Sequence, residues 1–83
     1  MNDLSDFSSF LLSLASSAFY YMGETDEQGN KEINLDIAKH TINTIEMLEV
    51  KTKNNLTKEE AVLIEDILYK LRTKFIKIKS KKN

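Results

Sequence analysis

The sequence predicts an all-α protein in which three helices form a single domain. The 83 residues include no proline and only two glycines, so very little in the chain interrupts a helix. Hydrophobic residues make up 41% of the chain and charged residues 30%, a balance typical of amphipathic helices. Apolar stripes with helical spacing predict helices at about residues 6–22, 35–52 and 58–78, and residues 79–83 are expected to be a disordered basic tail.

The first expected helix lies in the stretch FSSFLLSLASSAFYYMGE, residues 7–24. Ser5 or Asp6 can cap its start, and Gly23 stands where a C′ glycine would end it. Its apolar residues cover an arc of roughly 200°, whereas a helix packed on one side of its own domain needs only about 100°. We therefore expect a central helix that is buried on two sides, with a second subunit covering one of them.

Three serines, Ser9, Ser13 and Ser16, fill the narrow remaining sector of this helix. Small residues let helices approach closely, and a serine hydroxyl in a helix can bond back to the carbonyl one turn earlier. Two interpretations stay open on this evidence. The serines either face water or form a close-packed contact with another helix.

The boundaries of the second and third helices follow from local signals. Asn34 is a good N-cap for the second helix, and Asn54 and Asn55 tolerate the left-handed conformation that ends one. Thr57 followed by Glu60 matches the capping box, so the third helix is expected to begin directly after Thr57.

The third helix carries a second apolar line beside its main stripe. Val62, Tyr69 and Ile76 recur every seven residues, which resembles a seam against another helix. Glu65 and Arg72 lie along the same flank, and a salt bridge near the surface is the expected use of these charges.

Oligomerisation is the expected source of additional stability. A chain this short has a marginal core and usually needs disulfides, a metal or a partner subunit. The sequence contains no cysteine and a single histidine, His40, which excludes disulfides, thiolate metal sites and a multi-histidine cage. We expect a homodimer or homotetramer, with another protein as the alternative partner. The expected interface residues are Phe7, Phe10, Leu11, Leu14, Ala18, Phe19, Tyr69 and Ile76, with Phe10, Leu14 and Phe19 central.

No motif in the chain points to catalysis. A glycine-rich phosphate loop, a nucleophile elbow, metal-ligand spacing and a dinucleotide fingerprint are all absent from the sequence. The acidic connection GETDEQGNKEIN does not follow the order of a calcium loop. His40 falls on the polar side of its helix and is expected to be a surface residue. We therefore expect a non-enzymatic structural or protein-interaction module with no catalytic residue, cofactor or metal.

Charge is divided unevenly along the chain, and this division supports an alternative function. Residues 1–50 hold nine acids and two lysines, while residues 51–83 hold four acids and ten basic residues. The basic end could bind an anionic membrane surface or nucleic acid. The whole chain is mildly acidic, with a pI near 5.8, which argues against nucleic acid. The candidate anion-binding residues are Arg72, Lys74, Lys77, Lys79, Lys81 and Lys82.

The N-terminal segment predicts a cytoplasmic protein. Asp3 and Asp6 precede the apolar run where a signal peptide would carry basic residues, and serines interrupt that run. At about 16 residues the run is also shorter than the roughly 20 that a membrane span needs. The absence of cysteine suits a reducing compartment.

Two blocks of the chain resemble a known family. They are FSSFLLSLASSAFYYMGE and NLDIAKHTINTIEMLEVKTKNNLTKEEAVLIEDILYKLRTKF, and KTKNNLTKEE is their most specific segment. Together they are similar to the small bacterial domain-of-unknown-function family number eighteen forty-four. The resemblance implies a short, soluble, all-helical bacterial protein, and it carries over no catalytic or binding residue. The lysine-rich end beyond Phe75 lies outside the resembling region.

Overall fold

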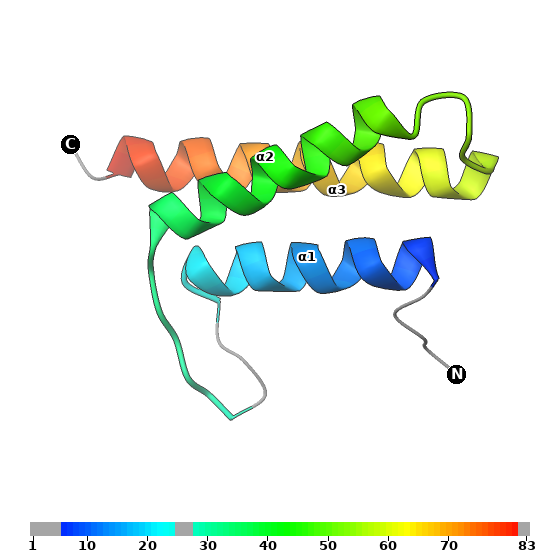
Figure 1. The fold of residues 1–83 in the computed structure, drawn as a ribbon. Coiled ribbons are helices and arrows are strands. Elements are labelled where there is room, and N and C mark those ends of the chain that lie inside the picture. Colours follow the sequence, from blue (N-terminus) through cyan, green and yellow to red (C-terminus); the bar gives the residue numbers. More distant parts are fainter. Residues whose placement is uncertain (1–5, 25–27, 82–83) are drawn as a thin grey trace.

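The computed structural model describes residues 6–24 and 28–81, and it is a bundle of three α-helices. They are α1 (Phe7–Tyr21), α2 (Leu35–Lys51) and α3 (Lys58–Lys81). Helix α2 runs antiparallel to α1 and α3, and each helix packs against both others (Figure 1). The described residues contain no strand, only an isolated bridge between Met22 and Ile33. The predicted all-α, three-helix fold is therefore confirmed.

Both ends of α1 are formed by the residue types that the sequence indicated. The Asp6 carboxylate caps the start, since it accepts a hydrogen bond from the Ser8 N–H at 3.2 Å. At the other end Gly23 has a φ of 101°, and its N–H donates to the Tyr20 carbonyl at 3.0 Å. The Glu24 N–H donates to the Phe19 carbonyl at 3.1 Å, and the two bonds together form a Schellman motif. Ser5, the other candidate cap, lies outside the described residues.

Local signals also set the start of α2 and of α3. The Asn34 side chain accepts from the Ile37 N–H at 3.2 Å, and Asn54 adopts the left-handed conformation, with a φ of 72°, in the connection that follows α2. The capping box is reciprocal. The Thr57 N–H donates to the Glu60 carboxylate at 2.9 Å, and the Glu60 N–H donates to the Thr57 hydroxyl at 3.1 Å.

The end of α3 corrects the sequence-based boundary. The helix continues to Lys81, so residues 79–81 are helical and do not belong to a disordered tail. Lysine is a good helix former, and the segment contains neither glycine nor proline to stop the helix. Residues 82–83 lie outside the described part of the chain.

The core lies where the three helices meet. Its fully buried large side chains are Leu11, Ile45, Ile64, Leu68 and Leu71. Around them pack smaller or partly buried residues of all three helices, among them Ala15, Ala18 and Ala38. Because α1 contacts both α2 and α3, part of its wide apolar arc is accounted for within one chain. Among the described residues of α1, Phe10 remains 40% exposed and Leu12 51% exposed.

Candidate interaction surfaces

The residues expected at a subunit interface fall into three groups in the structure. Leu11 and Ala18 are fully buried in the core of their own chain. Their assignment to a subunit interface was therefore wrong. The half-buried residues pack against the edge of that core: Phe7, Leu14 and Phe19. The exposed residues remain available to a partner: Phe10 at 40%, Tyr69 at 69% and Ile76 at 64% exposure.

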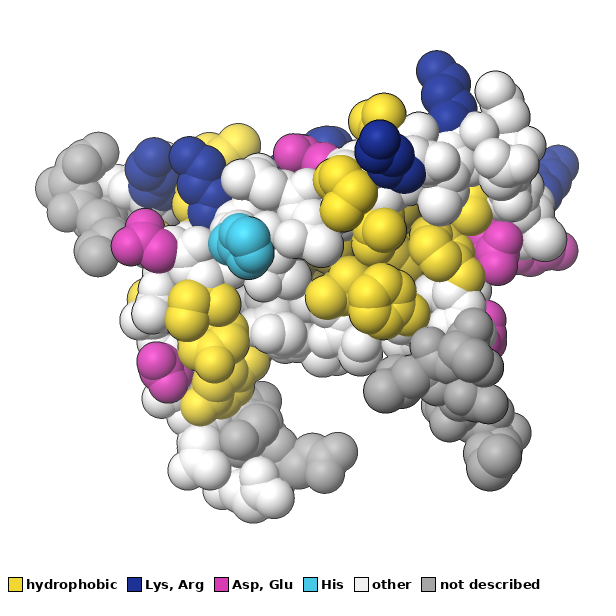
Figure 2. Space-filling view, in the orientation of Figure 1, with side chains coloured by type: hydrophobic (Ala, Val, Ile, Leu, Met, Phe, Trp, Pro, Cys, Tyr) yellow, Lys and Arg dark blue, Asp and Glu magenta, His cyan; other side chains and the backbone are white. Residues whose placement is uncertain are grey.

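One flank of α1 offers the first apolar surface. Phe7, Phe10 and Leu14 lie on the same side of the helix at spacings of three and four residues, and we call them the α1 flank. Apolar side chains gather where the N-terminal half of α1 lies beside the C-terminal half of α2 (Figure 2). In the same half of α2, Met47 is 48% exposed on the side of the helix away from buried Ile45. Leu12 lies about 160° around the helix from Phe10, on the opposite flank.

The serines of α1 point away from the core. Ser13 and Ser16 are exposed, and Ser9 is half-buried. The Ser13 hydroxyl donates to the Phe10 carbonyl at 2.9 Å, and the Ser9 hydroxyl donates to the Asp6 carboxylate at 3.5 Å. Within one chain these serines therefore line the outer side of α1, and close packing of another subunit on them stays a prediction.

The outer side of α3 offers a second apolar surface. Val62, Tyr69 and Ile76 are 59%, 69% and 64% exposed, and we call these three residues the α3 stripe. They lie on the side of the helix opposite its buried residues, among them Ile64, Leu68 and Leu71.

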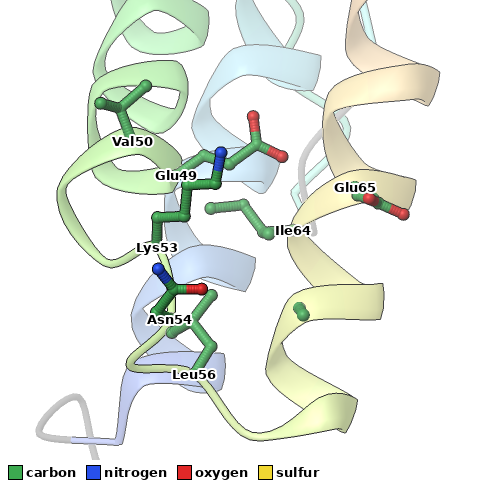
Figure 3. A pocket seen from close by; sticks show the side chains of 8 residues that line it. Glu49, Val50, Lys53, Asn54, Leu56, Ile64 and Glu65 are labelled. Atoms are coloured by element: carbon green, nitrogen blue, oxygen red, sulfur yellow. The ribbon is translucent and has the colours of Figure 1, made fainter.

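A groove between α2 and α3 was not anticipated from the sequence. It has a volume of about 520 Å³ and lies beside the connection between the two helices. Ile64 and Leu56 point into the space between the helices, whereas Glu65 points away from it (Figure 3). Glu49 and Lys53 add charged side chains to the lining. Part of the segment KTKNNLTKEE forms one wall of the groove. From the sequence, that segment predicted only where helices end and begin. The groove itself depends on how α2 packs on α3, which the sequence does not show.

The basic residues of α3 do not share one face. Arg72 and Lys74 are two positions apart and therefore project about 160° apart around the helix. The Arg72 guanidinium pairs with Glu46 of α2 at 2.8 Å, and Lys74 pairs with Glu24 at 3.3 Å. The expected bridge between Glu65 and Arg72 is thus replaced by a contact with α2, because residues seven apart on one helix are too distant to pair.

The other basic candidates lie in the last turns of α3 or directly after it in the sequence, and anion binding by them stays a prediction. Lys79 lies over the Phe75 ring, with its ammonium 5.9 Å from the ring centre, and Lys77 is exposed. The side chain of Lys81 and the whole of Lys82 lie outside the described part.

Residues suited to chemistry are dispersed. Among residues 6–24 and 28–81, no group of three or more histidine, cysteine or acidic side chains could hold a metal ion. His40 is exposed on α2, and its backbone carbonyl accepts a hydrogen bond from the Thr44 hydroxyl at 3.0 Å. None of the helices in the described part combines the length and apolarity that crossing a bilayer takes.

The fold and these surfaces define a small three-helix domain whose evident features are apolar helix faces. Residues 5–77 match the model of the family described as Domain of unknown function (DUF1844), and the chain belongs to that family. This confirms the resemblance found in the sequence. The comparisons with curated proteins and with solved structures gave no match.

Proposed function

We propose that this chain is a non-enzymatic structural or protein-interaction module that works as a homo-oligomer. The observation that carries the proposal is the distribution of large apolar side chains. Nine of them are exposed among the described residues, whereas the core holds eight buried residues larger than alanine. Single exposed apolar residues need no explanation, but here they recur along helix faces. The same proposal places the module in the cytoplasm of a bacterium.

The α1 flank is the proposed subunit interface. Phe10 is its most exposed member, and Phe7 and Leu14 present the partly buried edges on either side of it. An aromatic side chain between apolar neighbours is the kind of residue that supplies most of the binding energy at an interface.

Light scattering after gel filtration, over a series of concentrations, tests the proposal. The wild-type chain is expected at a defined multiple of 9.6 kDa that persists on dilution. Phe10→Asp should reduce the mass to that of one chain while its circular dichroism keeps the helical signal. A wild-type chain that is monomeric at every concentration would contradict the proposal.

Ser13→Asp is the matched control, because it adds the same charge one turn away on the serine side of α1. If Ser13→Asp dissociates the assembly and Phe10→Asp does not, the interface is the serine side. Phe10 is a better target than Leu14, since Leu14 packs against the core and a charge there would also destabilise the monomer.

A further inference from the structure

The α3 stripe is an apolar line that its own chain leaves exposed. Seven residues on a helix turn through about 700°, so Val62, Tyr69 and Ile76 lie within roughly 40° of one another. Their exposures of 59%, 69% and 64% show that no described part of the chain covers them. A helix needs only one apolar side to pack in its own domain, and α3 already buries Ile64, Leu68 and Leu71 on the other side.

The charges around the stripe change sign along the helix. The exposed charged residues of the N-terminal half are Lys58, Glu59, Glu65 and Asp66, a net charge of −2 from one base and three acids. Among the side chains of the C-terminal half that the structure describes, the exposed charged ones are Lys70, Arg72, Lys77 and Lys79, a net charge of +4, and the sequence places no acid there. The two halves belong to one straight helix, whose 24 residues span about 36 Å, so they cannot fold onto each other.

We infer that the α3 stripe packs antiparallel against the same stripe of a second copy of this chain, with Tyr69 near the two-fold axis. This arrangement places Val62 of each copy opposite Ile76 of the other. It also places the acidic half of each α3 against the basic half of its partner, whereas a parallel pair would place like charges together. A two-fold axis makes every contact occur twice, so one self-complementary stripe is sufficient.

The surface beside Val62 has a shape suited to this partner. A shallow hollow of about 540 Å³ is lined by Lys58, Glu59, Val62, Leu63 and Asp66. Its apolar residues meet Ile76 of the second copy in the antiparallel arrangement. Glu59 and Asp66 then lie on the flank where Lys77 of that copy arrives, because the same flanks of two antiparallel helices face each other.

The ion pairs within the chain leave this surface accessible. The Lys70 ammonium lies 3.0 Å from the Asp66 carboxylate on the same helix, but the Asp66 and Lys70 side chains remain 51% and 63% exposed. The Arg72 side chain is 49% exposed while it pairs with Glu46. Exposed pairs of this kind contribute little and can be shared with a second partner.

This pairing adds a second interface to the proposed oligomer and does not depend on the α1 flank. Three side chains per copy cover less than the roughly 800 Å² per partner of a standard stable interface. We therefore expect the α3 contact to be weak and to form at high chain concentration.

The absence of cysteine in the sequence makes disulfide trapping a clean test. Helices packed about 8–10 Å apart, with Cα atoms about 2.3 Å from each axis, bring facing Cα atoms to about 3.4–5.4 Å. That range overlaps the roughly 4.4–6.8 Å that a disulfide requires. Tyr69→Cys in the full chain should therefore form a covalent dimer at least about ten-fold faster than His40→Cys, an exposed control on α2.

Two further variants fix the direction of the helices. In an antiparallel pair the two copies of position 62 lie about 21 Å apart along the axis, so Val62→Cys alone should react only at the control rate. A mixture of Val62→Cys and Ile76→Cys chains should give the mixed dimer, identified by mass spectrometry. Rapid self-linkage of Val62→Cys would overturn the antiparallel arrangement, and Tyr69→Cys reacting at the control rate would overturn the pairing itself.

The same measurements in a Phe10→Asp background separate this inference from the proposed function. If the α1 interface is lost and Tyr69→Cys still links rapidly, the α3 pairing stands alone. If the assembly depends on Phe10 and Tyr69→Cys links no faster than the control in either background, the α1 interface stands and the α3 pairing is refuted.

Discussion

Two neighbouring residues of α3 provide the sharpest test of how this helix is oriented. Leu68 is 1% exposed in the core, and Tyr69, the next residue, is 69% exposed on the α3 stripe. We predict that Leu68→Ala lowers the free energy of unfolding by about 3–5 kcal/mol, because it removes buried methyl groups and leaves a cavity. Tyr69→Ala should change the free energy of unfolding of the monomer by no more than about 0.5 kcal/mol, as surface substitutions do.

These magnitudes are large compared with the stability available. At about 0.05–0.15 kcal/mol per residue, a chain of 83 residues has a free energy of unfolding of about 4–12 kcal/mol. Leu68→Ala therefore removes a quarter of it or more, and each kcal/mol corresponds to about 4–8 °C in Tm for a domain of this size. We expect its Tm to fall by more than about 10 °C.

Urea unfolding followed by far-UV circular dichroism measures both variants. Both changes are made in the Phe10→Asp background, at a concentration where light scattering shows the mass of one chain, so that loss of association does not add to loss of folding. If Tyr69→Ala then costs as much as Leu68→Ala, α3 is rotated from the orientation described here. The α3 stripe would then belong to the core, and the pairing inferred from it would fail.

The remaining predictions concern local contacts, each measured by the same unfolding experiment. Thr57→Ala and Glu60→Ala should each cost about 1 kcal/mol, and the double variant should cost less than their sum, because either change breaks the shared capping box. Gly23→Ala should cost about 1–2 kcal/mol, since its φ of 101° is strained for any residue with a Cβ. Glu46→Gln should cost no more than about 1 kcal/mol, and less in high salt, because its pair with Arg72 is half-exposed. A loss above about 2 kcal/mol at Glu46 would show that this pair fixes the packing of α2 on α3.

The helix ends could be predicted because their signals lie within a few residues of one another. Asp6, Asn34 and Gly23 bond to groups two or three positions away, so a single sequence contains all the information. The capping box at Thr57 is of the same kind. The end of α3 was predicted too early because no glycine, proline or capping residue marks it. The helix propensity of lysine therefore continues the helix past Ile78.

The partners of the helix faces could be predicted only in part. The width of the apolar arc on α1 indicated two neighbours, but a helical wheel does not say whether they belong to one chain or to two. Leu11 and Ala18 were therefore assigned to an interface, although α2 and α3 of the same chain bury them. Arg72 shows the same limit, since its partner Glu46 lies 26 positions away and only the packing of α2 on α3 brings them together.

Some charges of this unevenly charged chain form ion pairs within the fold, and others lie exposed on the outer side of α3. Glu24 and Glu46, from the acidic half of the sequence, each contact a basic residue of α3. These contacts join elements that folding brings together, and the fold alone explains them. The outer side of α3 differs, because its acidic and basic ends lie on one rigid helix and neither end can serve as the other's partner. The ion pairs that involve its described charges, Asp66 with Lys70 and Arg72 with Glu46, remain exposed. A second copy in the opposite direction supplies that partner at both ends at once, along the same line where the apolar residues of α3 are exposed. Charge and apolar surface therefore favour the same arrangement for independent physical reasons, and the cysteine variants test it directly.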